Sequence, residues 1–168
     1  MGYWGYFVVV RSGRPLAELG TLAAAPGLVR RRTAPGGWQV WEYPGGDGDV
    51  GNMNVLARET AAPALFGYVM DSDCVALEAA APESGAWTAC LGRDAMAGYL
   101  GGGDPDGLGV DDYFLEPPDA AERAAAWAAE AGHRVAPDVL LPVLTADPEP
   151  LAENLFFRLL DRLGVVPL

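Results

Sequence analysis

Short runs of β-branched and aromatic residues, each bounded by glycine, proline or aspartate, recur through the first half of the chain and constrain its fold most. These runs lie at residues 3–10, 28–33, 37–43, 64–70, 74–80 and 86–91. Their length and composition are typical of β-strands. Turn signals separate the second run from the third (Ala34-Pro35-Gly36) and the fourth from the fifth (Asp71-Ser72-Asp73), so each pair predicts a hairpin.

Helical patterns alternate with these strands and then take over the C-terminal part of the chain. The expected helices lie at residues 15–24, 54–62, 93–100, 119–131, 137–145 and 151–163. The last pattern is the clearest, because Leu151, Leu155, Leu159 and Leu163 recur at helical spacing and form one apolar face. This face is expected to cover the sheet or another helix.

Together these patterns predict an α+β fold, with a mostly antiparallel sheet, helices on one face and a helical C-terminal cap. The order of the first six elements, βαββαβ, matches that of a ferredoxin-like split unit. A chain of 168 residues fits one domain, and we expect residues 1–168 to form it.

The charge balance favours binding over catalysis. The formal net charge is -12, and all eleven basic residues are arginine. Such a charge repels nucleic acid and steers basic proteins into contact. We therefore expect a basic protein partner and no binding to nucleic acid.

The chain is expected to be cytoplasmic and to have no membrane-spanning segment. Its apolar start has no basic region before it, and no apolar stretch is long enough to cross a bilayer. Cys74 and Cys90 are too far apart in sequence for a C-x-x-C motif. We expect two buried thiols on neighbouring strands, although a disulfide remains open if the chain is exported.

Metal binding is not supported by the acidic loops. Asp47 and Asp49 have the spacing that begins a calcium loop, and Asp104 and Asp106 repeat it, but neither loop supplies the closing carboxylate. The single histidine, His133, has no second histidine or paired cysteine near it in sequence. We therefore expect no metal and no other cofactor.

No arrangement of residues predicts a reaction. Cys74 or Cys90 with His133 is a chance combination in a chain of this length. The carboxylates of Asp71 and Asp73 suit acid–base chemistry, but turns select aspartate for its backbone hydrogen bonds alone. The glycine run at 101–103 fits neither a dinucleotide nor a P-loop motif. We expect that the protein is not an enzyme.

The aromatic residues are the remaining candidates for a functional surface. Tyr3, Trp4, Tyr6, Trp38, Trp41 and Tyr43 come from strands that are predicted neighbours. Exposed aromatic rings surrounded by carboxylates are typical of protein-binding patches. The candidate binding residues are Trp38, Trp41, Tyr43, Asp47, Asp49 and Phe157. The alternative, in which these rings pack under loops and the C-terminal helices, stays open.

Two hypotheses follow. The first is a small acidic cytoplasmic protein that neutralises or regulates a basic partner, as immunity proteins and inhibitors do. The second is a small-molecule-binding or enzymatic domain with an aromatic pocket between the sheet and the C-terminal helices. In that pocket Arg30 or Arg32, which would share one face of a regular strand, holds an anionic group.

Overall fold

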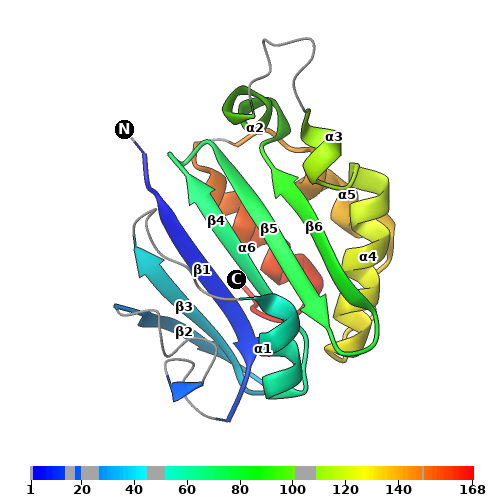
Figure 1. Ribbon diagram of the computed structural model, residues 1–168. Helices are drawn as coiled ribbons and strands as arrows, with labels where there is room; N and C mark the ends of the chain where they lie inside the picture. Colours follow the sequence, from blue (N-terminus) through cyan, green and yellow to red (C-terminus); the bar gives the residue numbers. More distant parts are fainter. Residues whose placement is uncertain (1, 14–17, 20–26, 45–51, 101–108, 149) are drawn as a thin grey trace.

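A computed structural model of the chain describes residues 2–13, 18–19, 27–44, 52–100, 109–148 and 150–168. These residues form an α+β fold with a six-stranded antiparallel sheet, as expected (Figure 1). The strands are β1 (Gly5–Arg11), β2 (Val29–Ala34), β3 (Trp38–Pro44), β4 (Ala64–Met70), β5 (Cys74–Ala81) and β6 (Gly85–Leu91). The helices are α1 (Met53–Thr60), α2 (Arg93–Tyr99), α3 (Val110–Tyr113), α4 (Pro117–Glu130), α5 (Pro137–Thr145) and α6 (Ala152–Leu163).

The sequence predicted these elements closely, with two exceptions. The short helix α3 was not expected, and the helix predicted at 15–24 lies mostly outside the described residues. In α6, Leu155, Leu159 and Leu163 are buried as predicted, but Leu151 precedes the helix and is 41% exposed.

The strand order agrees with the split unit that the element order predicted, although the helix predicted between β1 and β2 lies mostly outside the described residues. The sheet runs β2-β3-β1-β4-β5-β6, and all neighbouring strands are antiparallel. Strands β1 and β2 are therefore parallel to each other with β3 between them, and β3 and β4 are parallel with β1 between them. This interlocking is the ferredoxin-like arrangement, which β5 and β6 extend on one side.

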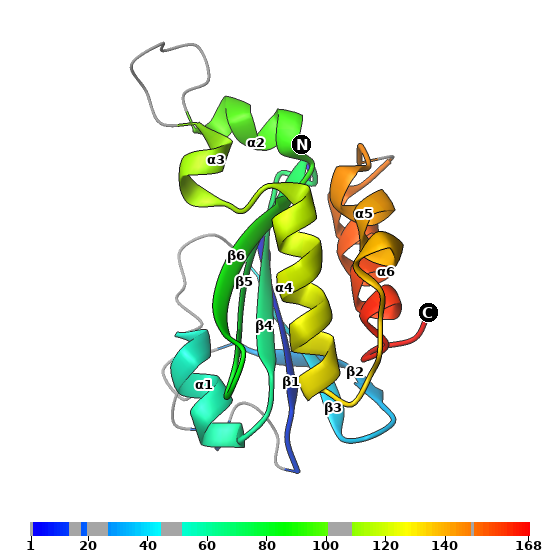
Figure 2. The ribbon, with the colours of Figure 1, turned by 90° about the vertical axis from the view of Figure 1, so that its right-hand side faces the viewer.

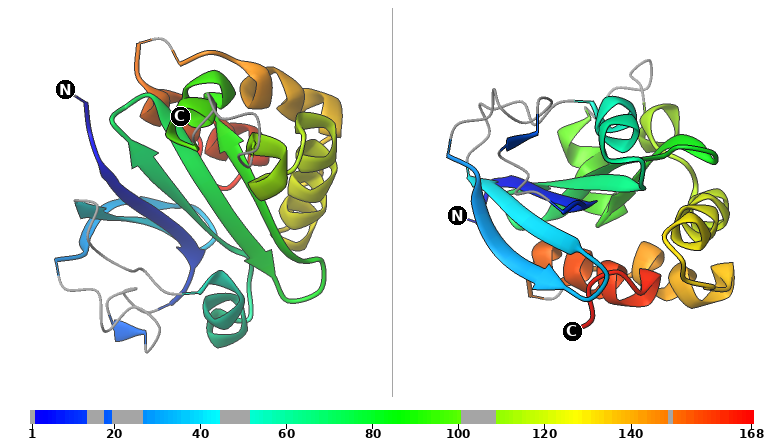
Figure 3. Two further views of the ribbon diagram at one scale, coloured as in Figure 1. Left: turned by 45° about the horizontal axis from the view of Figure 1, so that its top comes forward. Right: turned by 90° about the horizontal axis from the view of Figure 1, so that it is seen from below.

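Helices lie on both faces of the sheet. The predicted C-terminal cap, α4 to α6, covers one face, where Val9 and Leu65 pack with Leu159 (Figure 2). Helix α1 lies on the opposite face, where Leu56 packs with Val8 (Figure 3). The sequence predicted helices on one face only, which describes α4 to α6 but not α1. The candidate site lies on the face that carries α1.

Gly67 on β4 lies directly beneath Phe156 of α6. A Cβ at this position would lie 2.4 Å from Cε1 of Phe156. We expect Gly67→Ala to lower the free energy of unfolding by about 1 to 3 kcal/mol, because the buried ring must move. Chemical denaturation measures this change.

The control for this substitution is Gly98→Ala. Gly98 lies in α2, and a Cβ there would meet nothing within 4 Å. This substitution is expected to be neutral or slightly stabilising. Adding Phe156→Leu to Gly67→Ala should cost less than the sum of the two single changes. Equal stability of the Gly67→Ala and Gly98→Ala variants would contradict the packing of α6 on β4.

Candidate functional site

Trp38 and Trp41 do not contribute to an exposed patch. Trp38 is 2% exposed, and its ring centroid lies 5.8 Å from that of Trp127 on α4. Trp41 is 8% exposed, points to the opposite face and donates its indole N–H to Gln39 Oε1 at 2.7 Å. Strand β3 is an interior strand with residues packed over both faces, so both rings belong to the core. The sequence left open the alternative that these rings pack inside the fold, and the structure shows such packing for Trp38 and Trp41.

Of the other predicted binding residues, the two that the structure describes, Tyr43 and Phe157, lie on opposite faces of the sheet. Tyr43 is half-buried at the end of β3, on the same face as Trp41. Phe157 is half-buried on the face that α6 covers, with its ring centroid 5.1 Å from that of Phe7. Asp47 and Asp49 lie outside the described residues. The predicted set therefore does not form one described surface.

Arg30 and Arg32 lie on opposite faces of the sheet, contrary to expectation. A β-bulge at Arg31 breaks the alternation, so Arg30 pairs with Trp41 and Arg32 pairs with Val40. Arg32 Nη2 donates to the carbonyl oxygen of Pro167 at 2.7 Å. The two side chains are therefore not placed to hold one anionic group together.

The bulge also directs Arg31 toward a buried carboxylate. Arg31 Nε donates to Glu42 Oε1 at 2.5 Å, and the hydroxyl of Tyr3 donates to Glu42 Oε2. Burial and the neighbouring Glu42 carboxylate raise the pKa of Tyr3 well above its usual range. This network gives the arginine run a structural role at the edge of the sheet.

A different set of aromatic residues forms a continuous band on the face that carries α1. Its members are Trp4, Tyr6, Tyr43, Phe66, Tyr68 and Tyr99, and we call this set the aromatic band. Among the described segments, Figure 1 shows α1 at one end of this face and α2 at the other, with the strands between them uncovered by helix.

Strand register brings the rings of the aromatic band together. Tyr6 on β1 is directly opposite both Tyr43 on β3 and Tyr68 on β4. The centroid of its ring lies 6.3 Å from Tyr43, 5.4 Å from Phe66 and 4.4 Å from Tyr68. Such cross-strand aromatic pairs stabilise a sheet. Because these rings stand on paired strands, the fold holds them in fixed positions.

The band extends beyond the sheet through Trp4 and Tyr99. The Trp4 ring centroid lies 6.2 Å from that of Tyr68 and 6.0 Å from that of Tyr99 on α2. Trp4 is 39% exposed and Tyr99 is 40% exposed, whereas the other four rings are half-buried. In the sequence, Phe66 and Tyr68 are two residues apart in a predicted strand, which indicates that they share one face. No pattern near Tyr99 in the sequence indicates that it joins this surface.

The turn between β4 and β5 positions Trp4. Asp71 and Ser72 have φ values of 53° and 56°, in the left-handed region that costs non-glycine residues about 1 to 3 kcal/mol each. Gly2 N donates to Asp71 Oδ1 at 2.5 Å, and Tyr3 N donates to Ser72 Oγ at 2.8 Å. Asp71 therefore anchors the segment that carries Trp4.

Ser72 also joins this turn to α6. Its hydroxyl donates to Glu153 Oε2 at 3.0 Å, and its carbonyl oxygen accepts from Ala152 N at 2.8 Å. These contacts hold the left-handed conformation in place. Through these hydrogen bonds the turn connects the N-terminal segment that carries Trp4 to α6.

The exposed end of the band is acidic. The Tyr99 hydroxyl donates to Asp73 Oδ2 at 3.4 Å. Partial desolvation and the nearby carboxylates of Asp73 and Asp71 raise the pKa of Tyr99. A negative field therefore acts where Trp4 and Tyr99 meet solvent.

Both cysteine thiols are buried, which disfavours their thiolate form. Cys74 and Cys90 lie on neighbouring strands, as expected, and pack with Met96 of α2. Burial raises the pKa of Cys74 to about 12 and that of Cys90 to about 11.

The single histidine, His133, packs against Gly164 at the end of α6. Within the described residues, no group of three or more His, Cys, Asp and Glu side chains is arranged to hold a metal ion.

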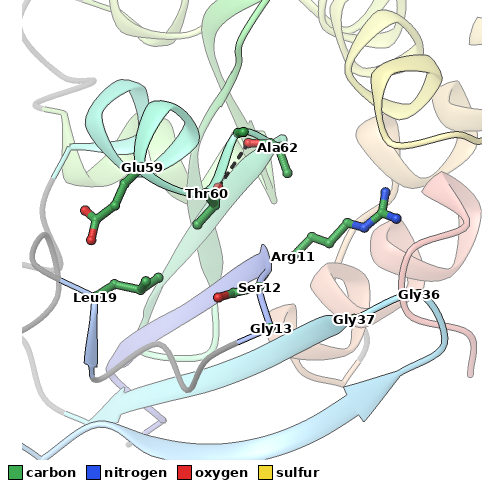
Figure 4. A pocket seen from close by; sticks show the side chains of 10 residues that line it. Arg11, Ser12, Gly13, Leu19, Gly36, Gly37, Glu59, Thr60 and Ala62 are labelled. Carbon is green, nitrogen blue, oxygen red and sulfur yellow. Dashed lines mark hydrogen bonds between the residues drawn. The ribbon is translucent and has the colours of Figure 1, made fainter.

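The expected pocket between the sheet and the C-terminal helices is filled in the described part of the chain. Trp38, Trp127 and Phe156 pack there at 2% exposure or less. A pocket of about 590 Å³ lies instead at one end of the sheet, beside the end of β1 and the end of α1. Figure 4 shows the side chains of Arg11 and Glu59 in this pocket pointing in different directions.

Comparisons with protein-family models, with curated proteins and with solved structures find no match to this chain. Among the described residues, no helix is both long enough and apolar enough to span a bilayer.

Proposed function

We propose that the protein is an acidic protein-binding module of the immunity-protein or inhibitor type, which binds a basic partner protein through the aromatic band. The observation that carries this proposal is the band itself. It joins six rings across the sheet and ends in two rings, Trp4 and Tyr99, that are 39% and 40% exposed.

The chemistry of the band suits a protein interface. Tryptophan and tyrosine are enriched among the residues that contribute most to binding energy, because they bury a large apolar area and keep a polar tip. Strand pairing holds Tyr6 and Tyr68 in place before a partner arrives, so little conformational entropy is lost on binding.

The charge of the chain supports a basic partner. The net charge of -12 favours the approach of a cationic protein, and Asp73 places a carboxylate at the exposed end of the band. The two buried free thiols suit a reducing compartment, which supports action in the cytoplasm.

A second candidate function is the binding of a small anionic molecule in the pocket beside Arg11. Its volume of about 590 Å³ lies within the range of known ligand sites. The side chains of Arg11 and Glu59 do not converge on one point, however, and the aromatic band lies outside the pocket. We therefore favour the binding module.

The proposal is tested with the partner that the protein captures from its source organism. We expect Phe66→Ala and Tyr43→Ala to weaken that complex by about tenfold or more each, as for residues that dominate an interface. The control is Tyr113→Ala, which removes a tyrosine that is 48% exposed and has no ring contact with the band. Calorimetric titration measures the affinities.

Circular dichroism and thermal unfolding must show that each variant is folded. If neither band variant weakens the complex more than Tyr113→Ala does, the band is not the interface. Capture of a small anionic molecule whose binding requires Arg11 would favour the second candidate.

A further inference from the structure

Three rings at the exposed end of the aromatic band are steeply inclined to one another. The planes of Trp4 and Tyr99 meet at 90°, with their centroids 6.0 Å apart. Tyr68 is the third ring, at 55° to Trp4 and 6.2 Å from it. Mutually inclined rings of this kind are the walls of the aromatic cages that recognise organic cations.

A carboxylate lies beside these rings. Asp73 is exposed and its Oδ2 accepts a hydrogen bond from the Tyr99 hydroxyl at 3.4 Å. The faces of aromatic rings carry negative electrostatic potential, and a carboxylate at the rim adds a formal negative charge. An apolar ligand would use the rings but not the charge, whereas an organic cation uses both.

We propose that Trp4, Tyr68 and Tyr99, with Asp73 at the rim, form an aromatic cage for the ammonium or guanidinium group of a lysine or arginine side chain. This inference rests on the proposed function, since the side chain belongs to the basic partner. It adds a defined anchor at one end of the aromatic band, separate from Tyr6, Tyr43 and Phe66.

The cage is supported before any cation arrives. Gly2 and Tyr3, which precede Trp4, hydrogen-bond to the turn at Asp71 and Ser72. Tyr68 stands on an interior strand of the sheet, and Tyr99 lies in the last turn of α2. A cation therefore meets walls from three separate elements that the fold already holds together, which limits the cost of binding.

The test uses single residues as probes and the full chain as the protein. The probes are the blocked amino acids N-acetyl-lysine methylamide and N-acetyl-arginine methylamide. The matched control is N-acetyl-norleucine methylamide, which keeps an unbranched apolar side chain and lacks the charge. Chemical-shift titration follows the indole N–H signal of Trp4, assigned with a Trp4→Phe variant. We expect the cationic probes to bind about two- to fivefold more tightly than norleucine.

Variants separate the cage from a general apolar surface. We expect Tyr99→Leu and Asp73→Asn each to remove the preference for cations, while Tyr99→Phe, which keeps the ring, retains most of it. Tyr113→Leu, outside the cage, should change nothing. Because Tyr99 and Asp73 are exposed, these variants are expected to fold. In them the titration follows the indole N–H of Trp4, which remains present.

Equal binding of norleucine and lysine would overturn the cage, and so would a cation preference that survives Tyr99→Leu. The proposed function would still stand in either case if Phe66→Ala weakened the partner complex. A third arm compares choline with its neutral isostere 3,3-dimethylbutan-1-ol. Ring-dependent binding of choline without binding of lysine or arginine would overturn the assignment to a partner side chain.

Discussion

Replacing Trp127 by alanine is expected to lower the free energy of unfolding by about 3 to 5 kcal/mol, the largest effect we predict for any single residue. Trp127 of α4 is fully buried and packs against Trp38 of β3. Its indole N–H donates to the carbonyl oxygens of Ala64 and Ala80, at 3.1 Å each. The substitution therefore leaves a large cavity and removes a hydrogen-bond donor that joins α4 to β4 and β5.

Two further variants serve as comparisons. One separates the hydrogen bond of Trp127 from the packing of its ring, and the other removes a tryptophan outside the core. Trp127→Phe keeps most of the ring but removes the N–H, and it should cost about 1 to 3 kcal/mol. Trp4→Ala removes an exposed tryptophan from a position outside the core and should cost much less. Urea denaturation measures all three, and the slope should stay constant if unfolding remains two-state. The packing of α4 on the sheet would be wrong if Trp127→Ala cost no more than Trp4→Ala.

The strands and helices were predictable because their signals are local. A run such as 64–70 combines β-forming residues with a turn signal after it, and the structure places β4 at those residues. The spacing of Leu155, Leu159 and Leu163 likewise indicated the buried face of α6. Hydrophobic periodicity and turn signals depend on residues that are close together in sequence, so sequence alone predicts them well.

The candidate site was harder to predict because it depends on what covers each face of the sheet. Trp38 and Trp41 look like exposed candidates in sequence, but residues from other elements cover both faces of β3. Tyr99 joins the aromatic band only because α2 lies beside the N-terminal segment with Trp4. The bulge at Arg31 is similarly non-local, since a regular strand would keep Arg30 and Arg32 on one face.

Association with the basic partner is expected to slow by about tenfold or more as the ionic strength rises from 0.01 M to 1 M. The Debye length falls from roughly 30 Å to 3 Å over this range, so the long-range attraction of a chain with a net charge of -12 is lost. Dissociation should change by less than about threefold. The contacts between the aromatic band and the bound partner are mainly apolar, so salt screening affects them little. Stopped-flow kinetics at several salt concentrations measure both rates.

Two pairs of variants separate the contributions of charge and aromatic contact. Asp73→Asn and Asp138→Asn remove the same charge from exposed positions, one beside the aromatic band and one on α5. Long-range steering acts on the approach, so Asp73→Asn should slow association at low salt more than Asp138→Asn does. Phe66→Ala should instead accelerate dissociation at every salt concentration, and Tyr113→Ala should not. Association that is indifferent to salt, or equal effects of the two aspartate variants, would mean that the acidic surface does not guide the partner to the aromatic band.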